Sequence, residues 1–93
     1  MPASHGFAYA KPALDYLDTI PAKFRRQIID KIKSLADNAH PAGTKQILSI
    51  MDGQNPVYRL RSGDFRVLYS VRDGSTIVIL DIGNRKDVYR RGN

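Results

Sequence analysis

The most informative segment for the fold is residues 57–71, Val57-Tyr58-Arg59-Leu60-Arg61-Ser62-Gly63-Asp64-Phe65-Arg66-Val67-Leu68-Tyr69-Ser70-Val71. Two runs of alternating side chains flank a short turn sequence, and this pattern is typical of a β-hairpin. Gly63 suits the first central position of a type II′ turn, which sets Arg61 directly opposite Arg66. A register shifted by one residue would mix arginines with apolar residues on both faces, so the hydrophobic pattern selects the first register.

That register sorts the side chains of the hairpin onto two faces of the sheet. The predicted core face carries Tyr58, Leu60, Phe65, Val67, Tyr69 and Val71. The other face carries Val57, Arg59, Arg61, Arg66, Leu68, Ser70 and Arg72. Arginines directly opposite each other destabilise a strand pair, and the nearest acid in the hairpin is Asp64 at the turn. We therefore predict a polyanion site, because guanidinium groups bind phosphate in a bidentate manner. An ordinary exposed arginine-rich face is the alternative.

The C-terminal residues add positive charge to the same part of the chain. Residues 57–93 hold eight Lys+Arg and four Asp, which accounts for +4 of the formal charge of +6. Tyr89 lies among four cations: Arg85, Lys86, Arg90 and Arg91. We expect Lys86 and Arg90 to contact a phosphate backbone. Lys45 is a further candidate for such a contact, with a solvated loop lysine as the alternative.

The remaining segments predict an α+β fold. A short helix is expected over residues 11–17, and Pro21 suits the first position of a second helix that runs to about Asn38. The apolar face of that helix consists of Phe24, Ile28, Ile32 and Leu35. Strands are expected over residues 46–50, 57–61, 65–71 and 76–82, with a weakly signalled strand over 7–10. This order predicts a small antiparallel or mixed sheet of about four to five strands, with the N-terminal helical pair packed on one face.

Length and composition limit the class of protein. A chain of 93 residues forms one domain, residues 1–93, because it buries only about 60–65% of its unfolded surface. The absence of Cys excludes disulfides and thiolate chemistry, and the carboxylates show no ligand spacing, so we expect no metal and no cofactor. The longest aliphatic run, residues 77–80, is far shorter than the roughly 20 residues of a membrane span. The first ten residues do not resemble a signal peptide, so we expect a cytoplasmic protein with no membrane partner.

The motifs of the second half resemble those of a known family. Three segments are similar to the RelE toxins of the RelE/ParE superfamily of bacterial and archaeal toxin–antitoxin modules: the hairpin residues 58–69, the strand residues 78–80 and Gly83-Asn84-Arg85-Lys86-Asp87-Val88-Tyr89. The segment Pro21-Ala22-Lys23-Phe24-Arg25-Arg26-Gln27-Ile28 is similar to the second helix of that family. The likeness covers nearly the whole chain and implies a RelE/ParE-like, microbial-RNase-like fold.

The resemblance implies an endonuclease that cuts mRNA in the decoding site of the 70S ribosome and is held silent by an antitoxin. On the family pattern, Arg66 stabilises the transition state, Arg85 stabilises the leaving group or phosphate, and Tyr89 is the catalytic tyrosine. Arg59 matches a residue that contacts the substrate backbone, and Arg61 matches a commonly basic position. The implied partners are mRNA, the ribosomal RNA backbone and a cognate antitoxin. For the antitoxin, the basic face predicts an acidic, amphipathic segment.

Elementary chemistry is compatible with these roles. RNA cleavage without a metal uses the ribose 2′-OH as nucleophile, so the protein must remove a proton and stabilise charge on the phosphorus centre. Histidine and glutamate are the usual acid and base, but the chain has no Glu, and His5 and His40 are distant in sequence from the arginines. Tyr89 is then the candidate base, because nearby cations favour its phenolate form. The alternative is that its ring packs against the sheet.

Two other functions are open at this stage. The first is a ParE-like toxin that poisons DNA gyrase and lacks the ribonuclease residues; the presence of Arg66, Arg85 and Tyr89 together argues against it. The second is a non-catalytic module whose arginines only bind RNA or phosphate. Few aromatic side chains are left to face solvent for base stacking, which argues against a single-strand-binding platform.

Overall fold

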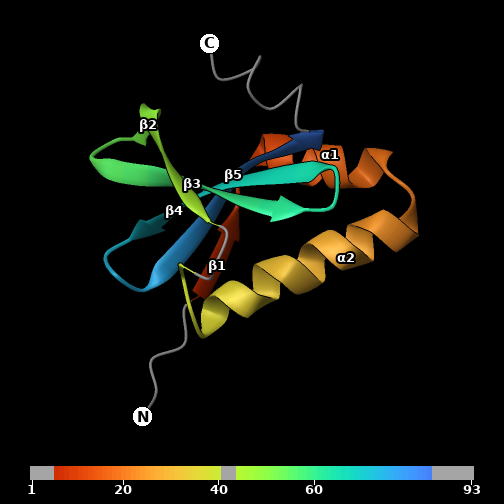
Figure 1. Cartoon of the computed structure of the whole chain (residues 1–93), viewed down its shortest axis with the longest axis horizontal. Coiled ribbons are helices and arrows are strands. Elements are labelled where there is room, and N and C mark those ends of the chain that lie inside the picture. The colour runs from red at the N-terminus through yellow and green to blue at the C-terminus, as the bar shows by residue number, and fades with distance from the viewer. Residues whose placement is uncertain (1–5, 41–43, 85–93) are drawn as a thin grey trace.

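The computed structural model describes residues 6–40 and 44–84 of the chain. They form a five-stranded sheet with two helices packed against one of its faces (Figure 1). The elements follow one another as β1 (Gly6–Tyr9), α1 (Lys11–Thr19), α2 (Ala22–Lys33), the 3₁₀ turn η1 (Ser34–Ala36), β2 (Lys45–Asp52), β3 (Asn55–Ser62), β4 (Phe65–Arg72) and β5 (Thr76–Asn84). The predicted α+β fold, with a mixed sheet and an N-terminal helical pair on one face, is confirmed.

The sheet has the strand order β1-β5-β4-β3-β2, which puts β4 in the middle. β1 pairs with β5 in parallel, whereas β2 to β5 form an antiparallel meander. In the β3–β4 hairpin, Arg61 lies opposite Arg66 and Arg59 lies opposite Leu68, as the alternation predicted. Gly63 has φ +58°, the left-handed conformation that the first central position of a type II′ turn requires.

The helical pair follows the prediction with two differences. Pro21 is the N-cap of α2, at φ −57° and ψ 147°, and does not occupy the first helical position. An N-cap residue is extended, and the pyrrolidine ring accepts that conformation as readily as a helical one. The helical segment ends with η1, short of Asn38. The Arg25 guanidinium donates to the carbonyls of Leu17 at 2.8 Å and Ile20 at 3.1 Å. It thereby satisfies carbonyls at the end of α1 and joins the two helices.

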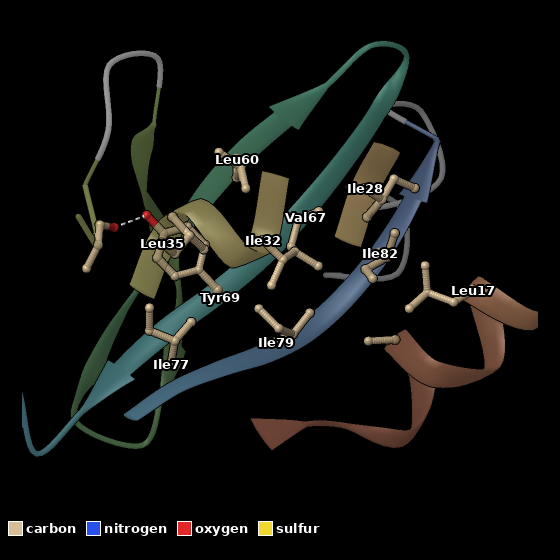
Figure 2. Packing of buried hydrophobic residues seen from close by; sticks show 12 residues of the cluster. Leu17, Ile28, Ile32, Leu35, Leu60, Val67, Tyr69, Ile77, Ile79 and Ile82 are labelled. Carbon is tan, nitrogen blue, oxygen red and sulfur yellow. Dashed lines mark hydrogen bonds between the residues drawn. The ribbon is translucent and has the colours of Figure 1, made fainter. Parts of the chain in front are cut away.

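The main core lies between the helices and the sheet, where side chains of α2, β4 and β5 point toward one another (Figure 2). Its largest fully buried members are Tyr69, Ile28, Ile32, Leu35, Ile77, Ile79, Ile82 and Val67. The Tyr69 hydroxyl donates to the carbonyl of Ala39 at 2.5 Å, and burial raises the pKa of Tyr69 to about 12. Phe24, predicted on the core face, lies at the margin: it is 37% exposed, and its ring centroid is 5.7 Å from that of Phe65.

Candidate nucleic-acid interface

Four of the predicted cations, those within the described residues, lie on the sheet face turned away from α1 and α2, which we call the far face. β3 and β4 point Leu60 and Val67 into the main core. Because side chains alternate along a strand, the residues on either side of them point to the far face. Lys45 of β2 lies directly opposite Arg59 and therefore shares that face. Three neighbouring strands thus contribute one cationic cluster: Lys45, Arg59, Arg61 and Arg66.

The four members of the cationic cluster differ in exposure. Lys45 and Arg61 are exposed and Arg59 is half-buried, whereas Arg66 is only 4% exposed. Arg66 lies on the middle strand, between Arg61 of β3 and Gly83 of β5, and its Nη1 donates to the main-chain carbonyl of the preceding residue at 3.2 Å. The sequence pattern placed Arg66 on this face and did not indicate its burial. The observed burial surrounds the guanidinium with little water, and electrostatic interactions are stronger there than at an open surface.

An apolar cluster occupies the middle of the far face. This far-face apolar cluster consists of Val57, Leu68, Ile47, Ile50 and Leu80. Ile47 and Ile50 of β2 pack onto this cluster where the pairing of β2 with β3 is irregular. Ile47 pairs with Val57 and Met51 pairs with Pro56, so residues 48–50 form an insertion in β2. Such a bulge bends a strand and re-aims its side chains. Val57 and Leu68, which the alternation placed on the same face as the arginines, are thus buried beneath side chains of β2 and β5.

The carboxylate of Asp52 lies at the other end of the far face, beside Ser70 and Arg72. Asp52 accepts hydrogen bonds at Oδ1 from Arg72 Nη2 (2.7 Å) and at Oδ2 from Arg72 Nε (2.8 Å) and Ser70 Oγ (2.6 Å). The hydrogen bonds from Arg72 and then Ser70 lower the pKa of Asp52, and the same pairing raises the pKa of Arg72. We call these three residues the Asp52 cluster. Arg72, predicted as part of the arginine face, is thus neutralised by an acid from a different hairpin.

The sequence reasoning missed Asp52 because it lies 20 positions before Arg72 in the chain. One signal was available: Asp52 precedes Gly53, which has φ +61°, so a tight turn returns the chain directly into β3. Val57 of β3 in turn faces Ser70 of β4. The bend that carries Asp52 over this neighbouring strand pair comes from the insertion in β2, and no alternation pattern reports it.

A second acid, Asp81, enters the sheet through a bulge in β5. Leu68 pairs with Asp81, whereas Tyr69 pairs with Ile79, so β5 has one residue more than β4 at this point. The extra residue lets Ile79 and Ile82 both reach the main core although they are three positions apart. The Asp81 carboxylate accepts a hydrogen bond from the amide of Ile82 at 2.9 Å.

Part of the predicted site falls outside the described residues: Arg85, Lys86, Tyr89 and Arg90. The structure therefore brings together Lys45, Arg59, Arg61 and Arg66 and leaves the four C-terminal positions as predictions. His40 packs its ring 4.5 Å from the ring of Tyr58, which itself lies against the main core. Hence His40 is on the opposite side of the sheet from the cationic cluster.

Within residues 6–40 and 44–84, no group of three or more His, Cys, Asp or Glu side chains is placed to hold a metal ion. No helix in the same residues is long and apolar enough to cross a membrane.

The described chain also forms an open hollow of about 500 Å³ between α2 and the β3–β4 turn, lined by Gln27, Asp30, Lys31, Ser34, Ser62 and Gly63. The cationic cluster contributes none of these residues.

Comparison with known proteins assigns the family. The model of the ParE toxin of the type II toxin–antitoxin system parDE matches residues 7–89. The chain belongs to the ParE toxin family. This ParE-family chain is thus a type II toxin of the RelE/ParE superfamily, as the sequence motifs had implied. No curated protein sequence matches it significantly.

Solved structures similar to this ParE-family chain are RelE proteins. The archaeal RelE–RelB complex from Pyrococcus horikoshii matches with a TM-score of 0.74 and 24% identity, over 88% of this chain and 96% of that one. The RelBE2 toxin–antitoxin complex of Mycobacterium tuberculosis matches with a TM-score of 0.72 and 20% identity, over 89% of this chain and 100% of that one. A mutant E. coli RelE toxin in the free state matches with a TM-score of 0.71 and 15% identity, over 96% and 94%. At these identities the likeness establishes the fold.

Proposed function

We propose that this toxin is a metal-independent endoribonuclease that cuts mRNA in the decoding site of the ribosome. The observation that carries the proposal is the cationic cluster, in which Lys45 lies opposite Arg59 and Arg61 lies opposite Arg66. Like charges placed directly opposite each other are unfavourable in an isolated sheet. An RNA backbone relieves this repulsion, because each phosphate supplies negative charge and guanidinium groups bind it in a bidentate manner.

In the proposed reaction, the ribose 2′-oxygen attacks the adjacent phosphorus while its proton passes to a base. The new 2′-O–P bond forms as the P–O5′ bond breaks, and the leaving O5′ takes up a proton from water. The products are a 2′,3′-cyclic phosphate and a 5′-hydroxyl end. Tyr89 is the proposed base, Arg85 supports the leaving oxygen, and Arg66 stabilises charge on the phosphorus centre. Preorganised donors aimed at developing charge are among the strongest contributions to catalysis.

The surroundings of Arg66 support its proposed role over that of a simple surface contact. Arg66 as a whole is 4% exposed, so a phosphate that reaches it leaves bulk water, and the attraction between the two charges increases. The exposed Arg61 lies directly opposite and offers a first contact for the substrate. Arg59 and Lys45 extend the same row and would bind the flanking backbone, with Lys86 and Arg90 as further contacts to mRNA or ribosomal RNA.

A cognate antitoxin is the proposed protein partner. The similar structures include RelE–RelB complexes from Pyrococcus horikoshii, Methanococcus jannaschii and E. coli, and the family model describes one half of a toxin–antitoxin pair. The chain carries a net charge of +6, so an acidic, amphipathic antitoxin segment would neutralise the cationic cluster. Recovery of a small acidic protein with the toxin from the native host, released at high salt, is the expected result.

A second candidate function is inhibition of DNA gyrase, and the match to the ParE toxin model favours it. The two functions predict different lesions in a cell. Induced expression, followed by mapping of message 5′ ends and of DNA breaks, separates them: cuts within translated codons support the ribonuclease, whereas DNA breaks without such cuts support the gyrase inhibitor. Arg66→Gln tests the assignment, and Arg26→Gln on the exposed side of α2 is the matched control for loss of one positive charge. The ribonuclease proposal expects the first variant to lose the cuts and the second to keep them.

A further inference from the structure

Two arginines of the same strand stand at opposite ends of the far face. Along β4, the side chains on the far face are, in order, those of Arg66, Leu68, Ser70 and Arg72. At the usual rise of a strand the two positions are roughly 20 Å apart. Arg66 lies beside Arg61, whereas Arg72 is held by Asp52 through two parallel hydrogen bonds. The far face therefore has an arginine at each end of β4, and the one at the Arg72 end is neutralised by Asp52.

The Asp52 cluster contains a bidentate ion pair between Asp52 and Arg72. Both carboxylate oxygens accept from Arg72, and Oδ2 also accepts from the buried Ser70 hydroxyl. The Asp52 side chain is 16% exposed, while that of Arg72 is 47% exposed. A phosphate that approached the open side of Arg72 would therefore meet a guanidinium whose charge is already balanced and a carboxylate directly behind it.

The fold explains how this acid reaches a strand that is not its neighbour. β2 pairs with β3 and not with β4, but the insertion at residues 48–50 bends β2. Ile47 and Ile50 then cover Val57 and Leu68, and the bent end of β2 delivers Asp52 to Arg72. The far-face apolar cluster thus separates the Asp52 cluster from the cationic cluster.

We propose that Asp52 is a specificity-determining residue that removes Arg72 from the polyanion site and confines phosphate binding to the end of the far face formed by Lys45, Arg59, Arg61 and Arg66. The inference rests on the phosphate-binding role in the proposed function and adds a boundary to that site. A chain of phosphates is held over the cationic cluster and finds no further binding position at Arg72. The alternative is that Asp52 only fastens the β2–β3 hairpin, in which case it has no effect on how many phosphates are bound.

The test measures binding of a fluorescein-labelled 2′-O-methyl oligonucleotide, which lacks the nucleophilic hydroxyl, by anisotropy as a function of NaCl concentration. The slope of log affinity against log salt reports the number of phosphates neutralised, at about 0.7 per contact for a single strand. Asp52→Asn frees Arg72, so we expect the slope to steepen by about 0.7, which is an additional loss of about 2.6-fold in affinity between about 50 and about 200 mM salt. The double variant Asp52→Asn/Arg72→Gln, which keeps the net charge of the parent, is expected to return to the parental slope.

Two single variants complete the design. Asp18→Asn, on the exposed side of α1, changes the net charge as Asp52→Asn does and is expected to leave the slope unchanged. Arg72→Gln alone is also expected to leave it unchanged, and this variant tests the inference without relying on the folding of Asp52→Asn. Thermal unfolding of each variant reports whether it is folded.

The outcomes separate this inference from the function on which it rests. A shallower slope for Arg72→Gln, or an unchanged slope for a folded Asp52→Asn, overturns the role of Asp52. An unchanged affinity for Arg59→Gln/Arg61→Gln instead overturns the phosphate site itself, whatever Asp52 does. Loss of mRNA cleavage is not used as a readout, so a failure of the ribonuclease proposal does not affect the result.

Discussion

Arg66 and Arg72 lie on one strand and one face, yet their surroundings are opposite. Arg66 is 4% exposed and faces another arginine, whereas the Arg72 side chain is 47% exposed and carries a bidentate ion pair with Asp52. The buried arginine lies opposite a like charge, and the exposed arginine is held by a carboxylate from another hairpin. Position on a face therefore does not determine what a charge can bind, because the neighbours that cover or balance it come from other strands.

The largest expected effect concerns the cationic end. Replacing Arg66 with Ala and Tyr89 with Phe together is expected to lower cleavage of ribosome-bound message by about 10²- to 10⁴-fold, since both proposed chemical groups are removed. Binding of the non-cleavable oligonucleotide is expected to fall only modestly, because Arg59, Arg61 and Lys45 remain. Cleavage would be followed on programmed ribosomes by primer extension. Normal cleavage by this double variant would refute the site assignment.

The apolar cluster between the two ends gives the next largest effect. Leu68 is 5% exposed and buried on the far face, so Leu68→Ala is expected to lower the free energy of unfolding by about 2–3 kcal/mol, in the lower part of the range for buried leucines. Leu48 on β2 is the matched control, because it is 83% exposed and its replacement by Ala should change stability by no more than about 0.5 kcal/mol. Urea denaturation measures both. Equal effects of the two substitutions would contradict the burial of the far face.

The cationic cluster can also be reduced without touching the buried arginine. The triple variant Lys45→Gln/Arg59→Gln/Arg61→Gln is expected to make the salt slope of oligonucleotide binding shallower by about 2, given about 0.7 per phosphate contact on a single strand. Arg72→Gln should leave that slope unchanged, so the two ends of the far face are compared in one assay. An equal loss of slope from both ends would remove the distinction between them.

The smallest expected effect is a dependence of stability on pH at the Asp52 end. The pKa of Asp52 in the folded chain lies below its usual value of 3.8 because of the hydrogen bonds from Arg72 and Ser70. Such a carboxylate contributes stability that is fully present above its unfolded pKa and is lost as the pH falls through the folded pKa. Thermal unfolding of the parent and of Asp52→Asn should therefore differ most at neutral pH and converge as the pH falls below about 4. A difference independent of pH would mean that the carboxylate charge is not what stabilises this end.

The β3–β4 hairpin is the part of the structure that local sequence patterns predicted in most detail. Its register, the conformation of Gly63 and the division into a core face and an arginine face follow from a repeat of two and from turn chemistry. Both properties involve only residues close in the chain. The placement of Arg59, Arg61 and Arg66 together on one face was therefore predictable, and the structure adds Lys45 from the adjacent strand.

The irregular strand pairings in β2 and β5 could not be predicted from local patterns. The insertion in β2 and the bulge in β5 each break the repeat of two, and they determine which side chains cover the far face and where Asp52 and Asp81 lie. The expected helix length and the position of Pro21 were wrong by small margins for a related reason, since packing against the sheet decides where a helix ends. None of these features has a signature within a short window of sequence.

Alternation, turn residues and spacing along the chain were sufficient to predict the α+β class, the hairpin register and the family motifs. The burial of Arg66, the place of Lys45 beside the arginines and the neutralisation of Arg72 became known only from the three-dimensional structure. Burial and charge balance depend on residues brought from distant positions, such as Asp52 against Arg72. The interaction energy of two charges depends on the distance between them and on how much water surrounds them, and neither can be read from the order of residues in the chain.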